Sequence, residues 1–331
     1  MNMKFDRCGA RLVIGVALAL CLPALARAGA VNAPHPVPVI LDTDIGDDID
    51  DTWALGLLLK SPELDLKLVV GDYGRAPYRA KLLAKFLQTA GRSDVAVGIG
   101  LDVPPAGAGG QAAWVQGYDL AQYPGKVFTN GVQALIDTIM KSPEPVTLIC
   151  IGPMPNIAEA LRREPRIAEH ARFVGMYGSV HMGYGGKKTP DAEWNVKANA
   201  AACRQAFTAP WDLTITPLDT CGLVQLGGAR YARVRDSRDP VAAAVIENYR
   251  IWSKHGAAAE KHSSTLFDTV AVYLAFSRDL CQMESVGLRV TDDGFTRCDA
   301  SAKQIHAATE WKDLNAYADL LVERLTAPLK K

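Results

Sequence analysis

Short apolar runs alternate with helical segments along most of the chain, and this pattern constrains the fold more than any other feature. Predicted strands cover residues 37–41, 64–72, 95–100, 146–152, 171–178 and 212–218. Predicted helices cover residues 52–61, 78–91, 131–142, 156–171, 198–209, 239–256, 268–277 and 316–325. Because alternating strands and helices form βαβ units, we predict an α/β fold with one open, mostly parallel sheet and helices on both faces. No repeat or composition break divides the pattern, so we expect one domain at residues 35–329.

The N-terminal end of the chain has the layout of a secretory signal peptide. Lys4, Arg7 and Arg11 precede an apolar run at residues 12–26, and small residues make a cleavage site near Ala28. The apolar run is short for a membrane span. We therefore predict an exported, periplasmic protein that has no membrane contact after cleavage.

Charge and cysteine content narrow the classes of partner. Residues 1–28, the predicted signal peptide, hold four of the 36 basic and one of the 36 acidic residues, which leaves 32 and 35 and a net charge of about −3. Since no basic face is implied, we expect no nucleic-acid partner. Five cysteines remain, and no spacing resembles a zinc site. In an exported protein we expect Cys281 to pair with Cys298 and Cys150 to be a buried core thiol.

An aspartate-rich segment, LDTDIGDDIDDTWAL, follows the first predicted strand. It holds six aspartates between Asp42 and Asp51. Close carboxylates repel one another unless a cation neutralises them, and oxygen ligands suit Ca²⁺ or Mg²⁺. Alternatively, the segment is a solvated helix start, where aspartate is favourable by itself. Its position at a strand end favours the metal site, because ligands bind beyond the carboxyl ends of the strands in open α/β sheets.

Two families begin with such a motif. Phosphatases of the haloacid dehalogenase type also have Asp-x-Asp after a first strand, but they usually carry Thr or Val where this chain has Gly46. The segment is more similar to the inosine-uridine-preferring nucleoside hydrolase family, in which the first strand precedes Asp-x-Asp-x-x-x-Asp-Asp. Asp42, Asp44, Asp50 and Asp51 match this motif, with two extra residues between the pairs.

The two extra residues leave open whether Asp47 and Asp48 or Asp50 and Asp51 fill the second acidic pair. The continuation DDTWAL resembles the helix of the family and favours Asp50 and Asp51. Further segments resemble the family in the same order, namely VVGD (69–72), IGPMPNIAEALRREPRI (151–167), AEWNV (192–196) and LFDTVAVYLAF (266–276). The resemblance covers about residues 37–326.

This resemblance implies an enzyme that hydrolyses the N-glycosidic bond of ribonucleosides or related N-ribosides, with one Ca²⁺ per subunit. The implied ligands are the carboxylates of Asp44, Asp51 and Asp268 and the backbone carbonyl of Ile151, and Asp42 would support the metal site without touching the ion. Asp44 would also be the general base that takes a proton from a metal-bound water. The implied substrate contacts are Asp50, Asp72, Met176, Glu193, Trp194, Asn195 and Phe267. The family forms dimers and tetramers, so we expect a homodimer or homotetramer.

The chain departs from the family where the leaving base is protonated. Phe267 stands where many relatives have a histidine proposed to donate this proton, and Asp72 replaces an asparagine. The segment 101–119, expected to be a mobile loop over the site, also lacks the histidine of the family. The leaving group therefore requires another acid, a stacked ring or a different aglycone. Candidate acids are His181 and His262, and candidate stacking residues are Trp114, Tyr118, Tyr184 and Trp194.

A second function class remains open on the sequence. A non-catalytic periplasmic protein that binds ribose or a nucleoside would keep the metal and sugar ligands without turnover. The presence of Asp44, Asp51 and Asp268 together favours the enzyme.

Overall fold

A computed structural model describes residues 35–103 and 109–328. Residues Pro36–Lys331 form one compact unit. The predicted signal peptide lies outside the described residues, as does most of the Gly/Pro-rich segment 104–110. No helix in the described part of the chain is long and apolar enough to cross a membrane.

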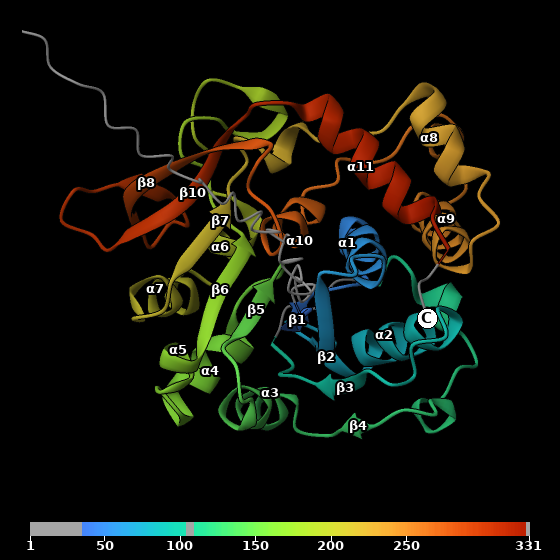
Figure 1. Ribbon diagram of the computed structural model, residues 1–331, viewed down its shortest axis with the longest axis horizontal. Coiled ribbons are helices and arrows are strands. Elements are labelled where there is room, and N and C mark those ends of the chain that lie inside the picture. The colour runs from blue at the N-terminus through green and yellow to red at the C-terminus, as the bar shows by residue number, and fades with distance from the viewer. Residues whose placement is uncertain (1–34, 104–108, 329–331) are drawn as a thin grey trace, which may run out of the picture. The chain divides into compact units, whose positions relative to one another are not determined.

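The strands and helices follow the alternation seen in the sequence (Figure 1). The strands are β1 (Val37–Thr43), β2 (Leu64–Gly71), β3 (Ala96–Ile99), β4 (Val127–Phe128), β5 (Val146–Cys150), β6 (Ala171–Met176), β7 (Leu213–Thr216), β8 (Cys281–Val290), β9 (Thr296–Cys298) and β10 (Gln304–Trp311). The α-helices are α1 (Asp50–Leu59), α2 (Ala76–Thr89), α3 (Gly131–Lys141), α4 (Pro155–Arg163), α5 (Ile167–His170), α6 (Trp194–Ala198), α7 (Ala200–Thr208), α8 (Gly228–Arg235), α9 (Pro240–Trp252), α10 (Thr269–Leu274) and α11 (Leu314–Thr326).

The described strands form one ten-stranded sheet in the order β4-β3-β2-β1-β5-β6-β7-β10-β8-β9. Strands β1 to β7 pair in parallel, and β10 is parallel to β7, whereas β8 is antiparallel to β10 and β9 to β8. Helices cover both faces, with α1, α2 and α9 on one face and α3, α4 and α7 on the other (Figure 1). The predicted fold class is confirmed.

Strand β1 marks the point where the direction of the sheet reverses. The chain extends the sheet from β1 through β2, β3 and β4 on one side and then returns to place β5 on the other side of β1. In register, Asp42 of β1 lies opposite Cys150 of β5, so Asp44 and Ile151 follow at the same edge. Such a switch point opens a crevice beyond the strand ends, which is the usual ligand position in open α/β sheets.

Two hydrophobic clusters fix this geometry from opposite faces of the sheet. Val39 and Leu41 face the cluster that contains α1, α2 and α9, whereas Ile40 faces the cluster that contains α3, α4 and α7. Alternation along a strand has this effect because successive side chains point to opposite faces. The crevice beyond the end of β1 is therefore bordered by a strand that is buried on both faces.

Three expectations from the sequence are wrong in detail. The helix predicted at 156–171 is two helices, α4 and α5, because Pro165 cannot continue the hydrogen bonding of a helix and restricts Glu164 before it. We also did not predict α8 or the antiparallel strands β8, β9 and β10 from the sequence. Strand β8 has exposed and half-buried residues without regular alternation, so its periodicity is weak.

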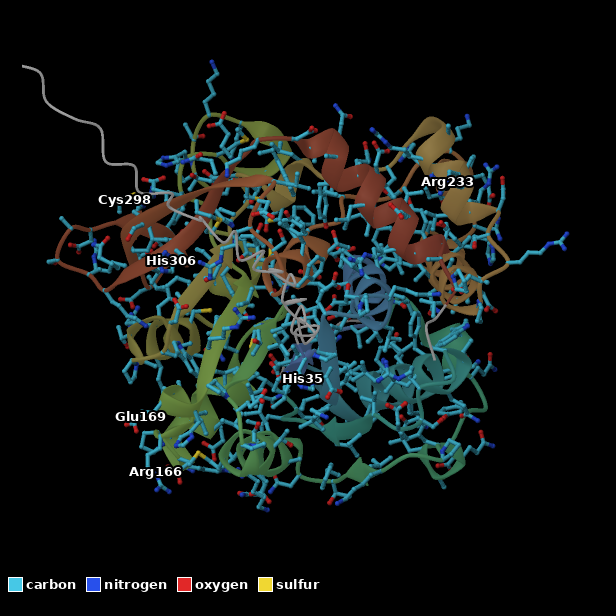
Figure 2. All side chains as sticks on the ribbon, in the orientation of Figure 1. His35, Arg166, Glu169, Arg233, Cys298 and His306 are labelled. Atoms are coloured by element: carbon cyan, nitrogen blue, oxygen red, sulfur yellow. The ribbon has the colours of Figure 1, made fainter. Side chains whose placement is uncertain are left out.

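The predicted disulfide between Cys281 and Cys298 is the third correction, since both thiols are free. Cys281 begins β8, whereas Cys298 pairs with Leu288, seven residues further along that strand. At the rise of a β-strand this separation is roughly 23 Å, far beyond disulfide reach. Figure 2 shows Cys298 on the outer hairpin, where it is exposed. Cys150 is a buried free thiol, as expected.

Candidate functional site

The end of β1 and the start of α1 place the aspartates around one pocket. Asp50 and Asp51 form the first turn of α1, where the amide groups of the helix start favour negative charge. Thr43, the last residue of β1, donates its hydroxyl hydrogen to Asp51 Oδ1 at 2.5 Å and accepts a hydrogen bond from the Ile45 amide at 3.1 Å. These bonds orient one carboxylate before any ligand arrives.

Arg79, a buried residue of α2, holds the loop between β1 and α1. Its guanidinium donates to the carbonyl oxygens of Asp44, Ile45 and Tyr73 and to Asp47 Oδ2, the last at 2.9 Å. No motif in the sequence pointed to Arg79, because its partners are mostly backbone carbonyls. The positive charge lies behind the aspartates and partly offsets their mutual repulsion.

Two glycines let the walls of the site approach closely. Gly46 has a φ of +109°, and a Cβ there would lie 2.6 Å from Tyr78 and Leu82 side-chain atoms. A Cβ on Gly152, just beyond β5, would lie 2.8 Å from the Asp44 amide nitrogen and from Asp44 Oδ1. Only glycine allows both approaches without displacement of the acidic loop.

Three carboxylates meet closely enough to share one cation. One oxygen from each of Asp50, Asp51 and Asp268 lies within 4.8 Å of the others, and all three residues are buried. Asp268 comes from the residue before α10, more than 200 positions away in sequence. Asp44 lines the same pocket and lies outside this compact group among the described residues. Asp50 was predicted only as a contact to the sugar, and the structure also places it in this group of possible metal ligands.

Burial raises the pKa of the carboxyl groups of Asp44, Asp50, Asp51 and Asp268. It raises the pKa of Asp44 to about 6, with Arg79 opposing the shift. Burial and then neighbouring aspartates raise the pKa values of Asp50, Asp51 and Asp268 well above the usual range. Without a cation, these groups compete for protons, which is the electrostatic signature of a site that a hard metal ion would satisfy.

Asp42 and Asp72 form a second buried acidic group behind these four carboxyl groups. Asn156 donates to Asp42 Oδ2 at 2.8 Å, and burial raises the pKa of Asp42 to about 7. Asp42 Oδ1 and both Asp72 carboxyl oxygens lack a hydrogen-bond partner among the described residues. Neither residue lines the pocket. Asp42 was predicted to support the metal site and Asp72 to contact the substrate, and both roles remain predictions for this buried pair.

The opposite wall is built by Glu193, the residue before α6, and by Asn195 in the first turn of α6. The Glu193 carboxylate accepts hydrogen bonds from the amides of Gly178, Asn195 and Val196 at 3.0, 2.7 and 3.2 Å. Asn195 Nδ2 donates to the carbonyl oxygens of Ile151 and Met176, each at 3.2 Å. Burial raises the pKa of Glu193 to about 7. These bonds fix both side chains at the pocket surface.

Together these walls enclose a pocket of about 390 Å³. The described lining residues are Asp44, Asp47, Asp48, Asp50, Asp51, Ile151, Met176, Tyr184, Glu193, Trp194, Asn195, Trp252, Phe267 and Asp268. We call Asp44, Asp50, Asp51 and Asp268 the acidic floor, and Tyr184, Trp194, Trp252 and Phe267 the aromatic rim. Asp47 and Asp48, the two inserted residues, also line the pocket.

The aromatic rim includes one residue that the sequence did not reveal. Trp252 ends α9 and donates its indole hydrogen to the carbonyl oxygen of Asp47 at 2.8 Å. The Tyr184 and Phe267 rings meet edge to face, with centroids 6.1 Å apart. The Tyr184 hydroxyl oxygen accepts a hydrogen bond from the Trp194 amide at 2.9 Å. An aromatic residue at the end of a long helix carries no sequence signal of its own.

Four residues singled out in the sequence lie elsewhere. Trp114 is buried and donates its indole hydrogen to Glu247, and Tyr118 donates to Gln88. The imidazole of His181 contacts Glu284, and that of His262 contacts the Ser263 carbonyl. None of Trp114, Tyr118, His181 and His262 is among the described lining residues. Of the four candidate stacking residues, Tyr184 and Trp194 do line the pocket.

The family can now be identified. The model of the family described as inosine-uridine preferring nucleoside hydrolase matches residues 39–324. The chain belongs to this family. The resemblance inferred from the aspartate motifs is therefore confirmed.

Relatives in the family share this sequence at moderate identity. The non-specific ribonucleoside hydrolase RihC of Escherichia fergusonii is 34% identical over 55% of this chain, and the match spans 62% of RihC. The pyrimidine-specific ribonucleoside hydrolase RihA of an Enterobacter species is 28% identical over 87% of this chain and 97% of its own length. The expected enzyme class agrees with the names of these relatives.

Solved structures show the same fold. The plant nucleoside hydrolase PpNRh1 has a TM-score of 0.76 at 23% identity, and covers 88% of this chain and 100% of its own. The purine-preferring ribonucleoside hydrolase from Gardnerella vaginalis has a TM-score of 0.72 at 22% identity, and covers 87% of this chain and 98% of its own. These likenesses establish the nucleoside hydrolase fold and leave substrate choice to the residues of this pocket.

Proposed function

We propose that this protein hydrolyses the N-glycosidic bond of ribonucleosides or related N-ribosides, with one bound Ca²⁺. The observation that carries the proposal is the group of three buried carboxylates, Asp50, Asp51 and Asp268, on the floor of a 390 Å³ pocket in a chain of this family. A nucleoside-sized ligand fits a pocket of this volume.

The donor set fits calcium. All side-chain donors at the floor are carboxylate oxygens, and burial has raised their pKa values, so a divalent cation would compensate the repulsion that protons otherwise relieve. Asp44, Asp51, Asp268 and the Ile151 carbonyl remain the predicted ligands, and the position of Asp50 adds it to the candidates. When bound, the ion would hold sugar hydroxyls and increase the acidity of a water molecule.

Asp44 is the proposed proton acceptor. Its side chain lines the pocket, while its backbone is held by Arg79 and packed against Gly152. Burial raises the pKa of Asp44 to about 6 in the metal-free protein, and a bound cation would lower it and so keep the carboxylate ionised and able to accept a proton. Asp44 would take a proton from the attacking water while the water oxygen forms its bond to C1′ of the sugar.

The remaining polar wall is proposed to hold the ribose. Asp50, Glu193 and Asn195 offer oxygen and amide groups to the sugar hydroxyls, and Met176 supplies an apolar contact beside them. Breakage of the bond leaves an oxocarbenium-like sugar, and preorganised carboxylates stabilise that positive charge. The backbone bonds to Glu193 keep it in place, so little reorganisation is needed.

Release of free ribose from a substrate panel tests the proposal. We expect 4-nitrophenyl riboside to be cleaved fastest, inosine more slowly and uridine slowest, because no histidine is among the described residues that line the pocket. A chelator should remove the activity and added Ca²⁺ should restore it. Tight nucleoside binding without any ribose release would favour the alternative, a non-catalytic binding protein.

Export and assembly remain separate proposals. The layout of residues 1–28 supports cleavage near Ala28 and a periplasmic location. Cell fractionation and N-terminal sequencing of the mature chain test both points. A homodimer or homotetramer is proposed from the family alone, and light scattering with mass determination tests it.

A further inference from the structure

The aromatic rim holds large hydrophobic side chains that are exposed to solvent. Of the described residues, only Tyr184, Trp194 and Leu223 are large hydrophobic side chains classed as exposed. Tyr184 is 39% and Trp194 56% exposed, and both line the pocket. Trp252 and Phe267 complete the rim and are half-buried. Exposed aromatic faces gathered at a pocket mouth indicate a planar ligand group there.

The charge of the pocket is strongly one-sided. Seven of the fourteen described lining residues are acidic, and none is Lys, Arg or His. Arg79 pairs with Asp47 at 2.9 Å but is not among the lining residues. Asp48, exposed beside it, accepts a hydrogen bond from its neighbouring Ile49 amide at 2.7 Å and has no cationic partner among the described residues. Even one divalent cation leaves the lining carboxylates in excess.

Aromatic faces combined with unpaired carboxylates select a particular class of ring. Aromatic side chains attract cations through their negative faces, and the attraction grows when the cation is partly removed from water. We propose that this site prefers N-ribosides whose aglycone is a cationic heteroaromatic ring, of the N-ribosylpyridinium type. The inference rests on the proposed function, because it names the substrate class of the same pocket.

The chemistry of such an aglycone matches the pocket. When the bond between C1′ and the ring nitrogen breaks, its electron pair neutralises the positive ring, which leaves as a neutral base. The water oxygen bonds to C1′, its proton passes to Asp44 and then to solvent, and no proton is needed by the leaving group. A neutral purine or pyrimidine must instead leave as an anion or be protonated, and the described lining residues offer no histidine for that.

Two comparisons of ligands test the preference. The first measures kcat/KM for N-ribosylnicotinamide, inosine and 4-nitrophenyl riboside with the Ca²⁺-loaded mature protein. We expect N-ribosylnicotinamide to exceed inosine by at least about ten-fold, the order expected of a partly desolvated cation–π contact plus one carboxylate. The second measures inhibition by the 1-methylnicotinamide cation and by neutral nicotinamide, which have nearly the same ring and differ in charge. The cation should bind more tightly, independently of intrinsic bond reactivity.

A charge variant tests whether the preference depends on a carboxylate in the pocket and not on the net charge of the protein. Asp48→Asn should lower the ratio of kcat/KM for N-ribosylnicotinamide to that for 4-nitrophenyl riboside by about three- to ten-fold, since it removes one negative charge from the pocket. Asp137→Asn makes the same charge change on the exposed surface of α3 and should leave this ratio unaltered. Addition of a 5′-phosphate to N-ribosylnicotinamide should reduce its kcat/KM, because the lining carboxylates repel an anion.

The outcomes are distinguishable. If inosine and 4-nitrophenyl riboside are cleaved but N-ribosylnicotinamide is no faster than inosine, the preference is overturned and the proposed function stands. Equal inhibition by 1-methylnicotinamide and nicotinamide, or an unchanged ratio in Asp48→Asn, also overturns it. If none of the three ribosides releases ribose in the presence of Ca²⁺, the proposed function fails and the preference fails with it.

Discussion

The acidic floor and the aromatic rim of one pocket are built by different means. The floor comes from the end of β1, the first turn of α1 and the residue before α10, and Asp50, Asp51 and Asp268 are buried. The rim comes from connecting segments, the first residue of α6 and the end of α9, and two of its rings are exposed. Strand ends in a packed sheet are fixed by the core, whereas connecting segments vary freely.

This difference suggests a division of roles. Thr43 and Arg79 hold the floor through buried hydrogen bonds, so its geometry changes little between substrates. The rim is held by few bonds, such as those from the Trp194 amide and the Trp252 indole. We therefore expect floor variants to change catalysis and metal binding, and rim variants to change substrate choice.

The largest expected effect is the loss of a floor carboxylate. Asp51→Ala should abolish tight Ca²⁺ binding and lower kcat/KM by more than about 10⁴-fold, since metal and transition-state stabilisation are lost together. Calorimetric titration with Ca²⁺ and ribose release measure the two effects. The fold should survive, because the change relieves repulsion among buried carboxylates. Unaltered Ca²⁺ affinity would remove Asp51 from the ligand set.

The next effect concerns Asp44, the proposed proton acceptor. Asp44→Asn keeps a metal-binding oxygen but cannot accept a proton, so kcat should fall about 10²–10⁴-fold, the scale of general base catalysis. The Ca²⁺ affinity should fall less than in Asp51→Ala. A near-normal kcat would transfer the role to another floor or wall carboxylate, with Asp48 or Asp50 the nearest candidates.

The third effect tests whether the floor depends on Arg79. Arg79→Met removes donors to buried carbonyl groups and leaves Asp47 without its cation, so the free energy of unfolding should fall by about 3–5 kcal/mol. Urea unfolding of the metal-free protein measures it. Arg92→Met is the matched control, because Arg92 pairs with Asp94 at the surface and should cost less than about 1 kcal/mol. If Arg79→Met lowers the free energy of unfolding no more than Arg92→Met does, the hydrogen bonds of Arg79 contribute little to stability.

The floor was largely foreseeable from the sequence, and so were three of the four rim residues, Tyr184, Trp194 and Phe267. Alternating apolar runs predicted the sheet, and the strand-end position of Asp44 and Asp51 predicted an acidic site, whereas Asp268 was assigned to that site only through the family resemblance. The place of Trp252 in the pocket could not be predicted, because Trp252 reaches the pocket from the end of a helix that is distant in sequence. The role of Arg79 could not be predicted either, because its partners are mostly backbone carbonyl groups, which any residue carries. Antiparallel β8 and β10 were missed because their exposed positions blur the alternation.

A fourth prediction follows from the raised pKa values. Burial raises the pKa of Asp44 to about 6 and that of Asp42 to about 7, so between pH 4 and 7 the folded metal-free protein binds more protons at these groups than the unfolded chain. These groups therefore stabilise the metal-free fold as the pH falls. Calcium must displace the protons of Asp44 and the other proposed ligands, so the rise in Tm that Ca²⁺ causes should be larger at pH 8 than at pH 5. A Ca²⁺ effect that is equal at both pH values would contradict the buried floor as its binding site.

The smallest expected effect tests the rim itself. Trp194→Ala removes the most exposed ring of the rim and should raise KM for aromatic ribosides about three- to ten-fold, the scale of one stacking contact. The kcat for a cleaved substrate and the Ca²⁺ affinity should change little, since no floor residue depends on the indole. The backbone amide that donates to Tyr184 remains in the variant, so the neighbouring ring keeps its hydrogen bond. A fall in Ca²⁺ affinity comparable to that of Asp51→Ala would show that rim and floor act as one unit, and the division of roles would fail.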